Sequence, residues 1–227
     1  MVKPFLSCMV LLSAMLLAAC VPNYRYPSRI NQFPVQQTIS KLYNEMNTSS
    51  ISSPSGLPST FSEFKQRCRN VATSPEGAAK MYFDAVFCYL EPQRRAEASK
   101  MLRYIMHADA GWESSQHYAT FVQRMRNSST HYIFRSFAAG TSPENGYRMS
   151  PQNYQLVYSG KSYEPDYVRV FLISSGSDSR RMLWVKQYDD GLWYVINNAD
   201  SYMKVREPVS AQSRYSHDAD YDNARVR

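Results

Sequence analysis

The residues able to do acid–base or metal chemistry are few and scattered along this chain of 227 residues. One residue separates His107 from Asp109, whereas His117 and His131 are isolated. The sequence contains no His-Glu-x-x-His zinc motif, no Gly-x-Ser-x-Gly nucleophile motif and no glycine-rich phosphate loop. The sequence therefore predicts no catalytic residue, no metal site and no cofactor, while leaving open a site built from residues that are distant along the chain.

Two polar loops, Gly140–Tyr147 and Ser174–Arg181, are the most distinctive segments. In the first interpretation they are self-capping turns, because Asn, Gly, Asp and Ser hydrogen-bond their own backbone or adopt positive φ. In the second they bind a ligand or partner through charge-assisted hydrogen bonds. The sequence favours the first interpretation and leaves the second open. The candidate binding residues are Glu144, Asn145, Asp178 and Arg180.

The N-terminus has the pattern of an export signal. Lys3 precedes the uncharged apolar stretch Phe5–Ala19, which is shorter than the ~20 residues of a membrane-spanning helix. The stretch ends in Leu17-Ala18-Ala19-Cys20, which resembles the lipobox of bacterial lipoproteins. Residues 1–19 are therefore predicted to be a signal peptide. An ordinary secretory signal that happens to contain a cysteine is the alternative.

The lipoprotein resemblance implies that Cys20 carries the lipid and anchors the protein to a membrane of the cell envelope. In enterobacterial lipoproteins, an Asp directly after that cysteine retains the protein in the inner membrane. This chain has Val21 there. The resemblance therefore implies the outer membrane, with the protein facing the periplasm, although a Gram-positive host stays open.

Two other cysteines, Cys68 and Cys88, lie in the predicted exported part of the chain. An oxidising compartment permits a disulfide between them, since they fall on consecutive predicted helices at the start of the domain. The alternative is a pair of buried apolar thiols. The sequence does not decide between the two.

The formal net charge is +7, and it becomes +6 when the signal peptide and its Lys3 are removed. This charge favours anionic lipid headgroups or an acidic envelope protein as a partner. Nucleic acid is not an expected partner, because no basic run interleaved with aromatic residues occurs. With 44% hydrophobic and 20% charged residues, the composition also excludes collagen-like, fully disordered and polytopic membrane proteins.

The helices and strands that would position a functional site are predicted to follow a polar tether. Residues 20–59 are rich in Ser, Pro and Asn, apart from a short amphipathic helix predicted around residues 39–46. Residues 60–208 are predicted to form one domain, and residues 209–227 a disordered tail. Capping patterns predict helix starts at Thr60 and Ser74, and apolar periodicity predicts further helices after Pro92 and around residues 118–125.

Strands are predicted in the second half of the domain, where Val, Tyr, Phe and Trp are frequent. The order of elements predicts an α+β fold in which three N-terminal helices pack on a curved, mainly antiparallel sheet. The predicted strands cover residues 131–138, 154–158, 167–174, 182–188 and 193–197.

This order of elements resembles the NTF2-like cone fold. The two polar loops, with Pro-Glu-Asn-x-Tyr at residues 143–147 and Ser-Ser-Gly-x-Asp-Ser-x-Arg at residues 174–181, resemble an uncharacterised bacterial domain family. Arg180 departs from the proline that this resemblance places there. Neither resemblance supplies an activity.

The function expected from these patterns is that of a lipid-anchored, non-enzymatic binding or assembly module of the cell envelope. A small enzyme with its active site in the mouth of the cone is the alternative. A pocket in which ionisable groups converge would favour the enzyme, and a filled core would favour the adaptor.

Overall fold

The computed structural model describes residues 56–109 and 111–212 of the chain. These residues belong to one compact unit. The predicted signal peptide, Cys20 and nearly all of the predicted tether, including its short helix, lie outside the described residues, as do residues 213–227. Residues 209–212, the first four of the segment predicted to be a disordered tail, are among the described residues. The backbone N–H groups of Ala211 and Gln212 both donate to the carbonyl of Pro208.

The first two helices begin at the residues that the capping patterns predicted. Helix α2 (Phe61–Val71) has Thr60 as its N-cap, and helix α3 (Pro75–Leu90) has Ser74, whose hydroxyl accepts a hydrogen bond from the N–H of Gly77. Gly77 is required by close packing, since a Cβ atom there would lie 1.7 Å from the carbonyl oxygen of Val71. Helix α3 is buried on nearly all sides, which makes it the central helix of the domain.

Three further α-helices follow in the described chain; the first two lie where apolar periodicity predicted helices, and the last was not predicted. They are α4 (Arg95–Ile105), α5 (Gln116–Arg126) and the short α6 (Tyr132–Arg135). Four single-turn 3-10 helices complete the set: η1 (Pro92–Arg94), η2 (Trp112–Ser114), η3 (Ser128–Thr130) and η4 (Ala199–Tyr202).

The sheet is a four-stranded antiparallel meander in the order β1-β2-β3-β4. Along β2, Val168, Val170 and Leu172 are buried, whereas the residues between them are half-buried. This alternation is expected of a sheet with one face on the core. The strands are β1 (Tyr158–Tyr163), β2 (Val168–Leu172), β3 (Arg181–Gln187) and β4 (Trp193–Asn197).

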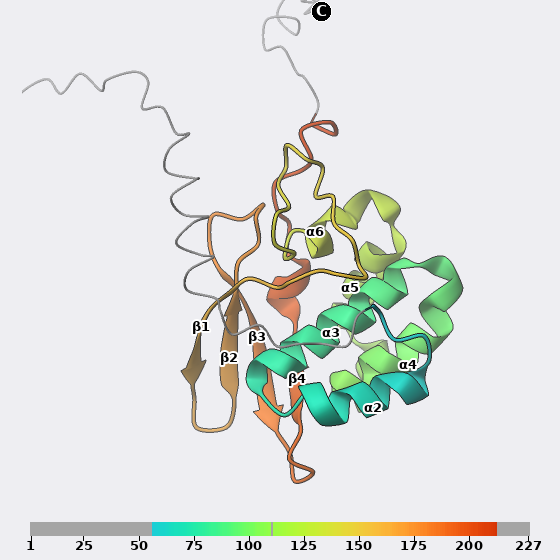
Figure 1. Ribbon diagram of the computed structural model, residues 1–227, viewed down its shortest axis with the longest axis vertical. Helices are drawn as coiled ribbons and strands as arrows, with labels where there is room; N and C mark the ends of the chain where they lie inside the picture. The colour runs from blue at the N-terminus through green and yellow to red at the C-terminus, as the bar shows by residue number, and fades with distance from the viewer. Residues whose placement is uncertain (1–55, 110, 213–227) are drawn as a thin grey trace, which may run out of the picture. The chain divides into compact units, whose positions relative to one another are not determined.

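Figure 1 shows the resulting layers: α3 lies beside the sheet, and α2, α4 and α5 lie farther from it. Helix α3 contacts β2, β3 and β4 on one side and α2, α4 and α5 on the other. The α+β fold expected from the sequence is therefore confirmed.

Two predicted strands are wrong. Residues 131–138 form α6 and a following turn, because the buried Ile133, Phe134, Phe137 and Ala138 recur at helical spacing on one side. Residues 154–157 form only an isolated bridge, between Leu156 and Ala138, and Tyr158 begins β1. Strand β1 was missed beyond its first residue, because its Ser, Gly and Lys residues have low strand propensity.

Candidate functional site

The loop Gly140–Tyr147 is closed by its own asparagine. Asn145 accepts hydrogen bonds from the backbone N–H groups of Ser142, at 2.9 Å, and Arg148, at 3.3 Å, and its amide donates to the carbonyl of Gly140 at 2.8 Å. The neighbouring Glu144 is exposed, and a hydrogen bond from its own backbone N–H lowers the pKa of its carboxyl. The polar side chains of this loop therefore act mainly on the loop itself.

The loop Ser174–Arg181 is held by a serine, and Asp178 has a different role from the predicted cap. Ser177 donates its N–H to the carbonyl of Ser174, and its hydroxyl accepts from the N–H of Ser179. The side chain of Asp178 is 94% exposed and lies 3.6 Å from the guanidinium of Arg206. Arg180 extends elsewhere, with its guanidinium 3.7 Å from the ring centroid of Phe171.

The two loops are fastened to each other through the chain that follows η4. The hydroxyl of Tyr147 donates to the carbonyl of Arg206 at 2.6 Å, and the N–H of Arg206 donates to the carbonyl of Gly176 at 2.8 Å. The N–H of Val209 in turn donates to the carbonyl of Pro143. Residues 139–148, 174–181 and 203–209 thus form one structural unit, here named the loop cluster.

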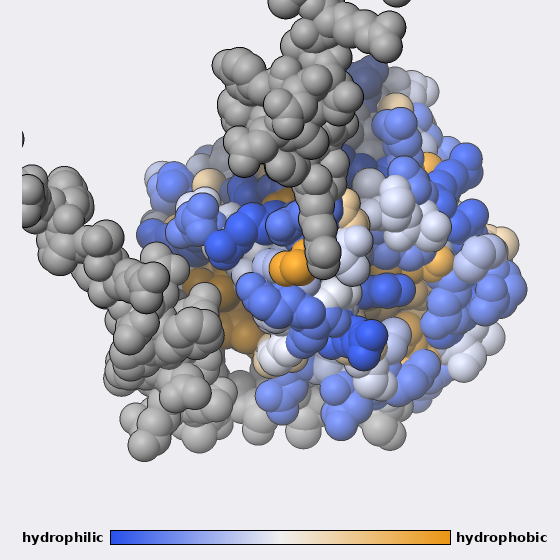
Figure 2. Space-filling view, turned by 90° about the horizontal axis from the view of Figure 1, so that it is seen from above, coloured by the Kyte–Doolittle hydropathy of each residue, from blue (hydrophilic) through white to orange (hydrophobic). Residues whose placement is uncertain are grey.

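Gly176 is the tightest point of the loop cluster. A Cβ atom at this position would lie 2.2 Å from the hydroxyl oxygen of Tyr147, so only glycine fits beneath that ring. The hydroxyl pair Ser136–Ser174, at 2.7 Å, joins the cluster to the residue after α6, and the pair Thr141–Ser175, at 2.9 Å, joins the two loops directly. Figure 2 shows this end of the molecule, where the described surface is mostly hydrophilic and hydrophobic residues show only in separate places.

The four residues predicted as a binding site therefore have separate contacts. Asn145 holds its own loop, Asp178 faces Arg206, and Arg180 lies over Phe171. No contact joins Glu144 to Asp178 or Arg180 within the described residues. The arrangement favours the interpretation of the two motifs as structural turns.

Cys68 on α2 and Cys88 on α3 are both buried in the same apolar core, and both thiols are free. Burial raises the pKa of the Cys88 thiol to about 12 and moves that of Cys68 in the same direction. The Cys88 thiol lies 3.6 Å from the carbonyl oxygen of Pro58. The structure thus contains the second of the two alternatives that the sequence left open, a pair of apolar core thiols.

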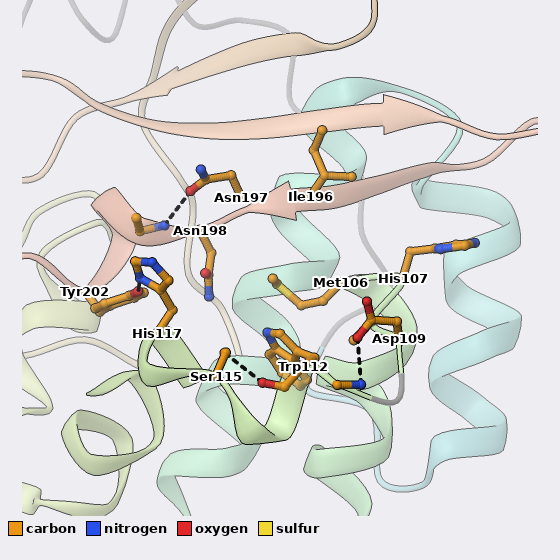
Figure 3. A pocket seen from close by; sticks show the side chains of 13 residues that line it. Met106, His107, Asp109, Trp112, Ser115, His117, Ile196, Asn197, Asn198 and Tyr202 are labelled. Carbon is orange, nitrogen blue, oxygen red and sulfur yellow. Dashed lines mark hydrogen bonds between the residues drawn. The ribbon is translucent and has the colours of Figure 1, made fainter. Parts of the chain in front are cut away.

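A different region carries a pocket. It has a volume of about 560 Å³ and lies between the end of α4, the η2–α5 segment and the end of β4 with η4 (Figure 3). This volume is typical of small-molecule sites. Its lining residues are Met106, His107, Ala108, Asp109, Gly111, Trp112, Ser115, His117, Ile196, Asn197, Asn198, Ala199 and Tyr202. We name it the β4 pocket.

Two consecutive asparagines form the polar side of the β4 pocket. The side-chain oxygen of Asn197 accepts from the N–H of Ala199 at 3.0 Å. The side-chain amide of Asn198 donates to the hydroxyl of Tyr82, which is itself 2.7 Å from the hydroxyl of Ser201. Tyr82 is fully buried, and burial raises its pKa, so its hydroxyl stays protonated. Both amides are therefore held in one orientation before any ligand arrives.

The ionisable groups of the pocket are turned toward separate partners. The carboxylate of Asp109 accepts from the N–H of Gly111 at 2.8 Å, and a ring nitrogen of His117 lies 3.5 Å from the hydroxyl of Tyr202. Figure 3 shows His107 extending away from the other labelled side chains. A nucleophile with an adjacent base, or a pair of facing acids, is not found among these lining residues.

His107 occupies a backbone position that usually holds glycine. Its φ is +44°, and it follows the end of α4, where its N–H donates to the carbonyl of Tyr104 and that of Ala108 donates to Arg103. This bond pattern is a Schellman motif, in which glycine is preferred after the C-cap. The imidazole stacks on Tyr188 with 3.9 Å between ring centroids. This contact offsets part of the backbone strain and shapes one end of the pocket.

Among residues 56–109 and 111–212, no group of three or more His, Cys, Asp or Glu side chains is arranged to hold a metal ion. None of the helices in this part of the chain is both long and apolar enough to cross a bilayer.

The described residues define a class of protein: an α+β domain with a helical layer over a short antiparallel meander and a small-molecule-sized pocket at the junction of the two layers. The chain belongs to the family described as a domain of unknown function, DUF6935, whose model matches residues 56–209. The expectation of an uncharacterised domain is thus confirmed. Neither the comparison with curated proteins nor that with solved structures gives a match.

Sequence reasoning did not find the β4 pocket. Its residues come from three segments, and of these only His107, Asp109 and the isolated His117 stood out along the sequence, as a weak catalytic signal. The consecutive asparagines at the end of β4 were one available signal, because a polar pair directly after an apolar strand often marks a turn or a binding edge. Their joint position opposite Trp112 depends on the packing of α5 against η4.

Proposed function

We propose that this chain is a lipid-anchored protein of the bacterial cell envelope, and that its domain binds a small ligand in the β4 pocket. The observation that carries the binding role is the pocket itself, with two amides already oriented by internal hydrogen bonds. Preorganised polar groups in an apolar hollow are typical of ligand sites.

The lipobox ending in Cys20 supports the envelope location and the membrane as a partner. Two or more acyl chains anchor a protein stably, because each buried methylene contributes ~0.8 kcal/mol. The chain between Cys20 and Gly56 is long enough to let the domain stand away from the bilayer surface. In this proposal the anchor lies in the outer membrane and the domain faces the periplasm.

The alternative function is catalysis in the β4 pocket. Catalysis in the β4 pocket would require a nucleophile with a base or two acids of different pKa facing one substrate position. His107, Asp109 and His117 instead contact separate groups. This separation supports binding over catalysis.

The binding role is tested by thermal unfolding of the mature, full-length protein with the small-molecule fraction of a cell-envelope extract. We expect the melting temperature of the wild type to rise, because a ligand that binds only the folded state stabilises it. Trp112→Ala should abolish the rise. The control Tyr163→Ala, which removes an aromatic side chain that is 68% exposed, should retain it. An equal rise in all three proteins would contradict the proposal.

The anchor is tested separately with Cys20→Ser. Metabolic labelling with a palmitate analogue should mark the wild type and leave the variant unlabelled, and the variant should leave the membrane fraction. Undiminished label on the variant would reject lipidation at Cys20.

A further inference from the structure

We propose that the ligand of the β4 pocket is a neutral saccharide of one or two rings. This inference rests on the proposed binding function and adds the chemical class of the ligand. Three properties of the pocket carry it: the hydrogen-bonding groups left to a ligand, the apolar walls beside them, and the charges that line it.

The hydrogen-bonding groups come as a donor and an acceptor on neighbouring residues. Asn197 uses its side-chain oxygen on Ala199, so its amide NH₂ is the group that remains to donate a hydrogen bond. Asn198 uses its amide on Tyr82, which leaves its side-chain oxygen. A hydroxyl group can both donate and accept, so adjacent hydroxyls match this pair without leaving a buried polar atom unpaired.

Apolar walls adjoin the two amides. Trp112 packs edge-to-face on Tyr118, with 4.7 Å between ring centroids, and so has a fixed position. Met106 is buried beneath the pocket, whereas Ile196 on β4 is 37% exposed at its edge. A sugar ring has an apolar C–H face and an edge of hydroxyls. It can therefore cover the indole and the Ile196 side chain while its hydroxyls reach the amides.

The charges that line the pocket favour a neutral ligand. Its lining contains no Lys or Arg to neutralise a phosphate or carboxylate, and anion recognition normally uses such groups. Its carboxylate, that of Asp109, already accepts from the N–H of Gly111. Desolvating an anionic ligand here would not be repaid by a Lys or Arg counter-charge, whereas a polyhydroxylated neutral ligand carries no such cost.

The experiment titrates the mature, full-length protein, held in a detergent without a sugar headgroup, with defined probes. These are cellobiose and N,N′-diacetylchitobiose as neutral disaccharides, glucuronate as an anion, glucosamine as a cation, and phenol as a neutral aromatic. Binding is followed by calorimetry and by saturation-transfer NMR. We expect saturable binding of at least one neutral disaccharide and no saturable binding of the other three probes.

Two tryptophan variants locate the site. Trp112→Ala should weaken the neutral disaccharide about ten-fold or more, which corresponds to about 1.4 kcal/mol. Trp184→Ala is the matched control, since Trp184 lies outside the pocket lining and stacks on Tyr167. The control should bind as the wild type does. Equal weakening in both variants would overturn the assignment.

The outcomes separate this inference from the proposed function. Trp112-dependent binding of glucuronate, glucosamine or phenol alone would overturn the saccharide class and leave the binding function standing. A Trp112-dependent response to envelope extract with no response to either disaccharide would do the same. No Trp112-dependent response to extract or to any probe would overturn both.

Discussion

The loop cluster and the β4 pocket use polar residues in opposite ways. In the loop cluster, side chains such as Asn145 and Tyr147 form their hydrogen bonds with neighbouring backbone groups. In the β4 pocket, Asn197 and Asn198 each use one polar group of the side-chain amide in an internal hydrogen bond. The other polar group of each amide remains for a ligand. The first region is closed around itself, and the second encloses a volume of about 560 Å³.

In this domain, therefore, the residues that form distinctive sequence motifs are not the residues that line the pocket. The motif loops are distinctive because tight turns restrict residue type, as the fit of Gly176 beneath Tyr147 illustrates. The pocket residues look ordinary along the chain, since a ligand site needs only a few groups brought together by packing.

Gly176→Ala should destabilise the protein most. The new methyl group meets the hydroxyl of Tyr147, so the loops must separate or the hydrogen bond to Arg206 must break. We expect the free energy of unfolding to fall by about 2–4 kcal/mol. Urea titration followed by circular dichroism measures it.

Gly140→Ala is the control for that substitution. Unlike Gly176, Gly140 has a positive φ, of +77°, and nothing lies within 4 Å of its Cβ position. Only backbone strain is added, at a cost of about 1 kcal/mol. If the two variants lost equal stability, the close approach at Gly176 would not be what holds the loop cluster together.

Tyr147→Phe should release the chain after η4 with a moderate effect. It removes the hydrogen bond to the carbonyl of Arg206 and keeps the buried ring, for a loss of about 1–2 kcal/mol. Hydrogen exchange should quicken in residues 203–209, and Tyr163→Phe, at an exposed site, should leave it unchanged. Unaltered exchange in Tyr147→Phe would show that the cluster is closed by other contacts.

Protonation of His131 should make the free energy of unfolding depend on pH. Burial lowers the pKa of its imidazole, and its Nε2 lies 2.8 Å from the carbonyl oxygen of Met125. A lowered folded-state pKa means that protonation favours unfolding, so stability falls as the pH drops below about 6.5. His131→Gln should lose less stability between pH 7.5 and pH 5. A loss as large as that of the wild type would assign the effect to other groups.

Asp178→Ala should have the smallest effect. The carboxylate is nearly fully exposed and its contact with Arg206, at 3.6 Å, is a surface ion pair. The stability should stay within about 0.5 kcal/mol of the wild type, and ligand binding in the β4 pocket should be unaltered. Loss of a binding partner with unchanged stability would show that the loop cluster is a recognition site, and would contradict its assignment as a purely structural region.

Local signals in the sequence determined the helix starts and the last three strands. Thr60 and Ser74 cap α2 and α3 as predicted, because N-cap preference depends on a side chain and the N–H two or three residues later. The predicted bounds of β4 were also correct, since an apolar, aromatic run between a Gly turn and an Asn pair is a strong local pattern. The α+β class follows from these elements and their order.

Tertiary structure alone decided the rest. The strand propensity of residues 131–138 was overridden because Ile133, Phe134 and Phe137 bury more apolar surface as a helical turn. The pairing of edge strand β1 depends on β2 and not on its own composition. The β4 pocket exists only because α5 and η4 meet, which brings Trp112 and Asn197 to one hollow from segments that are distant along the chain. No local pattern encodes such a meeting, since it depends on packing between segments some 80 residues apart.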